Sequence, residues 1–287
     1  MEHIKLVQTP TEGDARELSL DGDMGVYAEE AVSLRGYSPT VSLKGRHHIV
    51  STPPRDIELP VKIRTPAGSA AYETLCDICS TSLTTPTRVE VDGWSQDIVV
   101  TAADVRSITP TIREVTLGIT LCTGYWYRLG ETQRIGGARE PFVVFPFLGN
   151  TGLDYPHDYP YDYLSPPAPT QVAIDTTLGG DDVLLRIVWY AADEPPSLTI
   201  NGNTYAYNHT IPSDDYVTVD PLMHTVTRRT LNIEGATNTL RYAERGNGVN
   251  SGRYIFQPQP AAEPKLEVLT GTPSLVDITP IYRRIWL

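Results

Sequence analysis

Apolar residues in this chain recur mostly at every second position, the spacing that places them on one face of a β-strand. The clearest example is residues 56–64, where Ile57, Leu59, Val61 and Ile63 alternate mainly with charged residues. The same spacing predicts strands that contain Val89 and Val91, Val115 to Leu121, Leu198 and Ile200, Val217 and Val219, and Leu266 and Val268. Because these segments lie in both halves of the chain, the pattern predicts an all-β fold.

A tight hairpin is predicted at Asn201-Gly202, which separates two short strand-like runs. A two-residue hairpin turn needs a positive φ at both central positions, and Asn followed by Gly is the pair that best tolerates this.

One segment follows a helical period instead of a strand period. In residues 69–83 the larger apolar residues are spaced three and four apart, at Tyr72, Leu75, Cys76, Cys79 and Leu83. Gly68 precedes the segment, and Ser69 is a candidate N-cap. We therefore expect one amphipathic helix that packs through this apolar face across a sheet or barrel.

Length and composition favour two domains. A chain of 287 residues suits one large or two medium domains, and a hydrophobic share of 40% is sufficient for a core. Residues 154–169 contain 12 Pro, Tyr or Asp residues, too many prolines for a central strand. We expect an N-terminal domain over 1–128, a connecting segment over 129–169 and a C-terminal domain over 170–287. The tyrosines of the linker could pack over a domain seam or stack on a sugar or a partner chain.

The charge balance argues against a nucleic-acid-binding protein. The chain has 35 Asp and Glu against 23 Lys and Arg, a net charge of −12, and both halves are acidic. Tight binding of a polyanion needs clustered cations. The amino end resembles no export signal, and the sequence holds no apolar run long enough to span a membrane. Three cysteines do not describe a disulfide framework, so we expect synthesis in a reducing cytoplasm.

Several short motifs resemble reactive or metal sites but lack the rest of the constellation. Cys76 and Cys79 form a CxxC without two further ligands, so we expect these cysteines to pack in the core, and His47-His48 has no ligand at helical spacing. Asp21–Gly25 departs from a calcium loop after its first positions and predicts a turn. Gly246–Gly252 precedes the strand-like residues 253–256, whereas a dinucleotide loop would follow a strand, and it predicts a surface loop. We expect no enzyme activity, cofactor or metal, although sequence alone leaves a glycosidase-type carboxylate pair open.

The order of these segments resembles a known family, the distal tail proteins (Dit) of long non-contractile-tailed phages. The resemblance rests on residues 56–83, Arg88–Asp92, Ile98–Val100, Glu114–Tyr127 with its Tyr-Trp-Tyr end, Pro196–Gly202, Asp215–Asp220, Thr225–Thr227 and Tyr282–Trp286. It implies a split β-barrel or tail-tube-like N-terminal domain and a galectin-like C-terminal β-sandwich. It also implies a structural protein at the virion tail tip that forms a homo-hexameric ring. The ring joins the tail-tube protein to the tail-tip hub protein and lets DNA pass through its lumen.

A closed ring needs a heterologous interface, and edge strands are natural donors for one. We expect the ring surface to be built or flanked by the two alternating strands of the first domain, through Ile57, Leu59, Val61, Ile63, Val115, Leu117, Ile119 and Leu121. The negative charge would either face the channel, where it would not hold DNA, or only keep the chain soluble before assembly.

The alternative from another class is a carbohydrate-binding module that contacts host cell-wall polysaccharide. A sugar site normally shows an exposed aromatic platform, and the second domain could supply one from Trp189, Tyr190, Tyr205 and Tyr207. The competing interpretation, which we prefer, is that these rings pack inside the sandwich.

Overall fold

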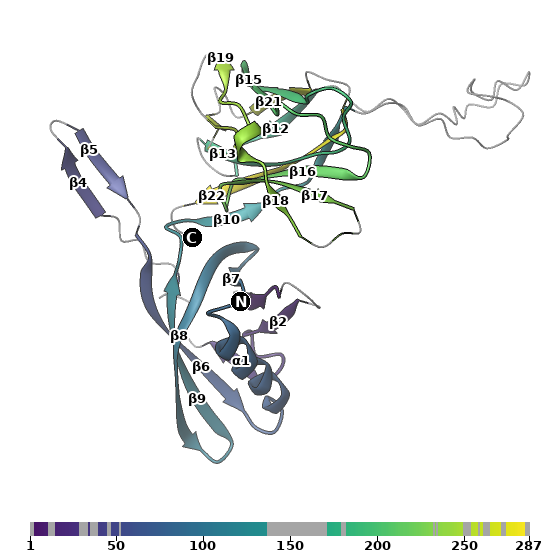
Figure 1. The fold of residues 1–287 in the computed structure, drawn as a ribbon. Helices are drawn as coiled ribbons and strands as arrows, with labels where there is room; N and C mark the ends of the chain where they lie inside the picture. Colours follow the sequence, from purple (N-terminus) through teal and green to yellow (C-terminus); the bar gives the residue numbers. More distant parts are fainter. Residues whose placement is uncertain are drawn as a thin grey trace, which may run out of the picture. The chain divides into compact units, whose positions relative to one another are not determined.

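The computed structural model divides the chain into two compact units, which are described separately (Figure 1). Unit 1 comprises residues 1–128 together with the end of the chain from Arg283, and unit 2 comprises Leu129–Tyr282. The structure describes residues 3–10, 15–28, 34, 40–44, 47–51, 53–136, 171–178, 182–231, 233, 235–248, 254–257, 259–260, 265–270 and 274–284. The predicted linker, residues 154–169, lies outside the described residues.

Unit 1 is a sheet of antiparallel strands with one helix. Its elements are β1 (Ile4–Gln8), β2 (Arg16–Ser19), β3 (Val26–Ala28), β4 (Thr40–Lys44), β5 (His47–Ser51), β6 (Arg55–Arg64), α1 (Ser69–Thr81), β7 (Thr87–Val91), β8 (Trp94–Thr109), β9 (Ile112–Leu121) and β10 (Trp126–Leu129). The strands pair in the order β2, β1, β7, β8, β9, β6, β3, and β4 pairs with β5 as a separate two-stranded sheet.

The two ends of the strand order in unit 1, β2 and β3, are themselves linked by hydrogen bonds. Beyond β2 the chain bridges to β3 through the antiparallel pair Asp21 and Tyr27, and the Ala28 N–H donates to the Leu20 carbonyl at 3.0 Å. The alternation of the sequence explains the core, because every second residue is buried from Leu59 to Ile63 in β6, throughout β7, and from Val115 to Leu121 in β9. The predicted turn at Asp21–Gly25 lies in this bridge, with Gly22 and Gly25 both at positive φ.

The helix exists as predicted, but it buries a different face. Its core residues are Ala71, Leu75 and Ile78, whereas Cys76 is exposed and Leu83, beyond the helix end, is 76% exposed. Ser69 is the first helical residue and does not cap the helix, since Gly68 holds that position without a side-chain hydrogen bond. The prediction of the packed face was wrong because threefold and fourfold spacing fits two adjacent stripes of a helix equally well.

A buried glutamine fixes the end of α1 to β1. The Gln8 side chain is fully buried, and its Nε2 donates to the Ile78 carbonyl at 3.3 Å and to Thr87 Oγ1 at 3.2 Å. Its Oε1 accepts from Thr81 Oγ1 at 2.9 Å. The amide thus links β1 to the last turn of α1 and to the start of β7, and its own buried polar atoms are satisfied.

Unit 2 has two main antiparallel sheets. Its elements are β11 (Gln133–Ile135), β12 (Gln171–Asp175), β13 (Asp182–Trp189), β14 (Ser197–Ile200), β15 (Asn203–Ala206), β16 (Asp215–Asp220), β17 (Thr225–Thr230), β18 (Thr237–Asn238), the 3₁₀ helix η2 (Leu240–Tyr242), β19 (Asn247–Gly248), β20 (Gln259–Pro260), β21 (Lys265–Thr270) and β22 (Val276–Arg284). One sheet runs β18, β17, β16, β13, β22, β11, and the other runs β12, β21, β14, β15, β19.

The two sheets of unit 2 share one aromatic core. Trp189 on β13 and Tyr207, just after β15, lie with their ring centroids 6.2 Å apart, and both are buried. The hairpin between β14 and β15 turns at Asn201 (φ 44°) and Gly202 (φ 76°), which confirms the predicted turn. The fold is therefore all-β with one α-helix, as the sequence predicted.

Three details differ from the sequence prediction. Residues 129–136 belong to unit 2 and contain β11, where a connecting segment was expected. The chain from Arg283 belongs to unit 1, where Arg283 and Arg284 stack over the rings of Tyr125 and Trp94. Residues 254–257 form a turn instead of a strand, because the Gln257 N–H donates back to the Tyr254 carbonyl at 3.0 Å.

Candidate functional site: surfaces for assembly

The eight residues expected at the ring surface lie mainly in the core of unit 1. All but one of these side chains are at most 2% exposed, namely Leu59, Val61, Ile63, Val115, Leu117, Ile119 and Leu121. Ile57 is half-buried. These seven side chains can therefore stabilise the strands that carry a ring surface, but they cannot themselves contact a neighbouring subunit in this conformation.

The backbone of these strands is also largely paired. β9 lies between β6 and β8 along its whole length. β6 pairs with β9 throughout and with β3 at Val61–Ile63, so only its first half lacks a second partner among the described strands. A charge placed at Val61 or Leu117 would unfold unit 1, so it would not test assembly.

The longest free strand edge in the described part of unit 1 belongs to β8. β8 pairs with β7 only as far as Ile98, whereas its other side follows β9 to Thr109. The Ser82 hydroxyl donates to the Val100 carbonyl at 3.1 Å, just beyond the last residue of β8 that pairs with β7. Residues 101–106 are exposed, and a register shift between Val100 and Ala102 bends the strand there. Ile98–Val100 was among the segments that resembled the family, but the continuation of the strand to Thr109 was not predicted, because the exposed residues 101–106 show no alternation of apolar and polar side chains.

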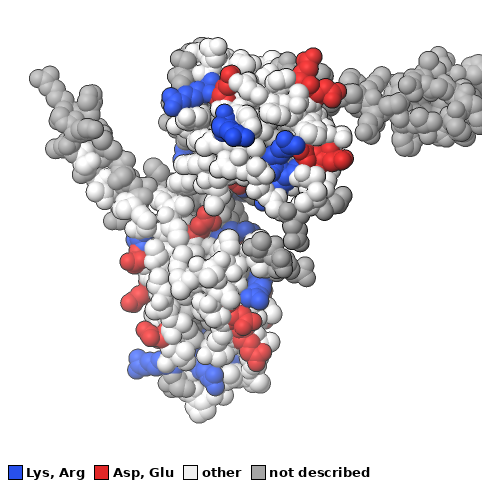
Figure 2. Space-filling model, viewed as in Figure 1, with Lys and Arg blue, Asp and Glu red and all other residues white. Residues whose placement is uncertain are grey.

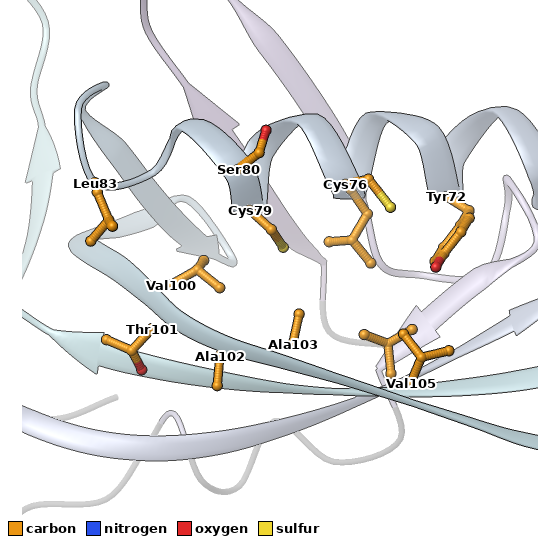
Figure 3. A pocket seen from close by; sticks show the side chains of 12 residues that line it. Tyr72, Cys76, Cys79, Ser80, Leu83, Val100, Thr101, Ala102, Ala103 and Val105 are labelled. Atoms are coloured by element: carbon orange, nitrogen blue, oxygen red, sulfur yellow. The ribbon is translucent and has the colours of Figure 1, made fainter.

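An apolar groove runs between α1 and this part of β8 (Figure 3). It has a volume of about 430 Å³. In Figure 3, Tyr72 and Cys79 of the helix point toward the strand, and Val100 and Ala103 point back toward the helix. All five residues of the helix face predicted to be core line this groove, and of these only Leu75 is also buried: Tyr72, Leu75, Cys76, Cys79 and Leu83. We call this feature the α1–β8 groove.

The cysteines of the groove are not a metal site in the described structure. Cys76 is exposed and Cys79 is half-buried, so the expectation that these two cysteines pack in the core is wrong for Cys76; Cys122 is exposed as well. Burial and the neighbouring Cys76 raise the pKa of the Cys79 thiol to about 11, which keeps it protonated at neutral pH. No group of three or more His, Cys, Asp or Glu side chains arranged to hold a metal occurs among the described residues.

Three of the four aromatic residues considered for a sugar platform lie in the core of unit 2. Trp189, Tyr205 and Tyr207 are at most 1% exposed. They pack inside the sandwich and present no exposed ring to a ligand. Only Tyr190 is partly exposed.

Tyr190 belongs to a polar cluster that joins β11 to β22. Its hydroxyl donates to Asp277 Oδ2 at 2.8 Å, and Arg134 binds the same carboxylate through two nitrogens at 2.7 and 2.8 Å. The Arg134 guanidinium holds the pKa of Asp277 below its ordinary value, and burial beside Asp277 raises the pKa of the Tyr190 hydroxyl. The cluster occupies the Tyr190 hydroxyl, which leaves it poorly placed for a sugar.

An aromatic stack in unit 2, whose Tyr254 and Phe256 rings are half-buried, was not predicted from the sequence. The rings of Tyr254 and Phe256 stack at 5.1 Å with 6° between their planes, and His224 stacks on Phe256 at 5.5 Å. Arg245 lies over the Tyr254 ring at 4.7 Å. These residues are far apart in sequence, and only the fold brings them together.

The charges on the described surface are mixed in sign. On the face shown in Figure 2, acidic and basic side chains are interspersed on both units. Several basic residues are engaged by carboxylates, including Arg88 by Glu90 and Arg186 by Asp220. No helix in the described part of the chain has the length and apolar character needed to span a membrane.

No protein-family model matches the sequence, and no curated protein matches it. Several solved structures, however, match the fold of this chain. The chain is similar over its full length, and over all of the matched chain, to a chain from the structure of the phage P2 baseplate in its activated conformation with Ca, with a TM-score of 0.56 and 11% identity. A second phage P2 baseplate structure, in the activated conformation with Sr, matches with a TM-score of 0.55 and 10% identity, again over both whole chains.

The class defined by this comparison is a two-unit all-β fold found in a phage baseplate. A third structure that matches is that of the Dit protein of phage SPP1, described as a paradigm of the hub adsorption apparatus in phages that infect Gram-positive bacteria. It covers 98% of this chain and 99% of its own, with a TM-score of 0.48 and 7% identity. The two phage P2 matches confirm the fold that the resemblance to distal tail proteins predicted.

Proposed function

We propose that this protein is a structural component of a phage tail tip, a distal tail protein whose copies form a six-membered ring. The ring joins the tail tube to the tail-tip hub and lets DNA pass through its lumen. The observation that carries the proposal is the match to a baseplate chain over the full length of both chains, covering both units.

The physical features of the chain support this role. Unit 1 has a free strand edge beside an apolar groove, and such an edge offers unpaired backbone groups to a neighbouring subunit. The net charge of −12 gives the wall of a ring no general attraction for DNA phosphates. Unit 2, which we propose to be the galectin-like part, builds its core from two antiparallel sheets.

Coexpression with a tail-tube protein, followed by negative-stain microscopy, tests the proposal. We expect rings with a central hole attached to the ends of tubes. A chain that remains monomeric with the tube protein present, or that adds along the sides of tubes, would contradict it.

The half-buried aromatic stack, with the exposed Arg245 beside it, favours a second candidate function, the binding of cell-wall polysaccharide by unit 2. If this function holds, the site is the surface of Tyr254, Phe256 and Arg245, because the rings first considered are buried. A glycan array with the full chain tests it. Sugar retention that disappears in Tyr254→Ala supports binding there, and no retention by the wild type rejects it.

A further inference from the structure

We propose that the α1–β8 groove receives the β4–β5 hairpin of a second copy of this chain, with one hairpin strand pairing with the free edge of β8. This inference rests on the proposed function, because it names the contact that would join neighbouring subunits of the ring. Each subunit would present its hairpin on one side and its groove on another, which is the heterologous arrangement that closes a ring.

The receiving surface combines a backbone edge with an apolar wall. From Val99 onward, β8 has no strand partner on its β7 side within the described residues. Val105 on this stretch is 55% exposed and Leu83 at the end of the groove is 76% exposed, so apolar surface faces solvent in the single chain. A paired strand would satisfy the edge and cover these side chains together.

The hairpin is a strand donor without a third strand of its own. β4 and β5 pair with each other from Thr40 opposite Ser51 to Lys44 opposite His47. They form a separate two-stranded sheet, and no other described strand pairs with them. An isolated two-stranded hairpin is marginally stable in water, and addition to an existing sheet stabilises it.

Charge complementarity between α1 and the segment that contains the β4–β5 hairpin favours the hairpin as the occupant of the groove. The charged residues of α1 are Glu73 and Asp77, both exposed and both acidic, and one cation, Arg113, lies beside the groove over the Tyr72 ring at 5.7 Å. Residues 31–55, which contain the hairpin, carry four Lys or Arg residues and no Asp or Glu, in a chain whose net charge is −12. The cations of this segment and the acidic residues of α1 would attract each other, which steers the two surfaces together.

Site-directed cross-linking tests this contact directly. Ser42 lies exposed on β4, and Cys76 lies exposed on the groove. In a Cys79→Ser, Cys122→Ser background, Ser42→Cys treated with a short bismaleimide should give covalent dimers and higher multimers. These should disappear when Cys76→Ser is added. The matched control is Thr204→Cys, an exposed position on the β14–β15 hairpin, which should give at least tenfold fewer cross-links.

Exposed groove residues give an independent measurement. Val105→Asp and Leu83→Asp change side chains that are already exposed, so the fold should be retained. We expect each to reduce assembly at least tenfold, measured as the fraction of assembled protein by sedimentation velocity. Met24→Asp changes an equally exposed apolar residue of unit 1 outside the groove and should assemble like the wild type.

The outcomes separate this inference from the proposed function. Rings that form normally with Val105→Asp and show no cross-link from Ser42→Cys to Cys76 overturn the groove contact and leave the ring role intact. A cross-link found only within one chain also overturns it. A wild-type chain that remains monomeric alone and with the tube protein, and gives no intermolecular cross-link, overturns both.

Discussion

The buried side chain of Gln8 contributes to the stability of unit 1. Gln8 connects β1, the end of α1 and the start of β7 through its amide. Gln8→Leu keeps the volume but leaves the Ile78 carbonyl and the Thr81 and Thr87 hydroxyls without this partner. Because unsatisfied buried polar groups are costly, we expect unit 1 to lose about 1–3 kcal/mol of unfolding free energy, measured by urea denaturation. The same exchange at exposed Gln171 should change stability by less than about 0.5 kcal/mol. Equal losses at both positions would contradict the role of Gln8.

The Cys79 thiol of α1 should react slowly with alkylating reagents in the folded chain. Cys79, with a pKa of about 11 against an ordinary 9.0, should be alkylated about 100-fold more slowly near pH 8 than in the unfolded chain, because the thiolate is the nucleophile. Its rate should rise about tenfold per pH unit up to that pKa. Mass spectrometry of iodoacetamide-treated protein at several pH values measures this. Equal labelling rates for Cys79 in the folded and unfolded chain would contradict the burial of its thiol.

Asp277 should contribute to stability in a pH-dependent way. Its folded-state pKa is lowered mainly by the Arg134 hydrogen bonds. A lowered folded pKa stabilises the fold fully above the unfolded pKa near 3.8, and this contribution is lost as the pH falls through the folded pKa. Asp277→Asn should cost about 1 kcal/mol at pH 7, a modest value because Arg134 is largely exposed.

Acid titrations of unfolding measure the Asp277 contribution. The variant should show a flatter loss of stability below pH 4 than the wild type. Asp193→Asn, at an exposed aspartate of the same unit, serves as control. An unchanged acid profile for Asp277→Asn would show that the cluster does not stabilise unit 2.

At the scale of elements, the alternating strands and the tight hairpin were predictable because they depend on neighbouring residues alone. β6, β9 and the Asn201-Gly202 turn follow from periods of two and from backbone preferences. The free edge of β8 and the aromatic stack at Tyr254 were not predictable, because they depend on which distant strands stop short or turn back. For the same reason the sequence suggested buried strand faces as the ring surface, whereas exposure distinguishes the edge of β8.

The helix gives a direct test of which face is core. Ile78 is fully buried and Leu83 is 76% exposed. Ile78→Ala should therefore cost about 2–5 kcal/mol of unfolding free energy, through lost burial and the cavity left behind. Leu83→Ala should change it by less than about 0.5 kcal/mol. Thermal or urea unfolding of the two variants measures the difference. A larger loss for Leu83→Ala than for Ile78→Ala would contradict the packed face seen in the structure and favour the one predicted from the sequence.

The whole molecule consists of two β-rich units, and we propose that the groove beside α1 in unit 1 serves assembly. The features that a single chain leaves unsatisfied lie on unit 1: a strand edge, an apolar groove and a hairpin paired only with itself within the described sheets. One type of contact could satisfy all three when copies meet. The sequence predicted the all-β class and a ring role, and the structure supplies the surfaces through which we propose the ring forms.

The mass and symmetry of the assembled particle show whether the chain forms a six-membered ring. Light scattering combined with negative-stain class averages, on the chain assembled with its tube protein and then released, should give six copies of the 31.7-kDa chain around an open centre. A closed particle without a hole, an open filament, or a monomer under all conditions would contradict a ring-forming tail-tip protein.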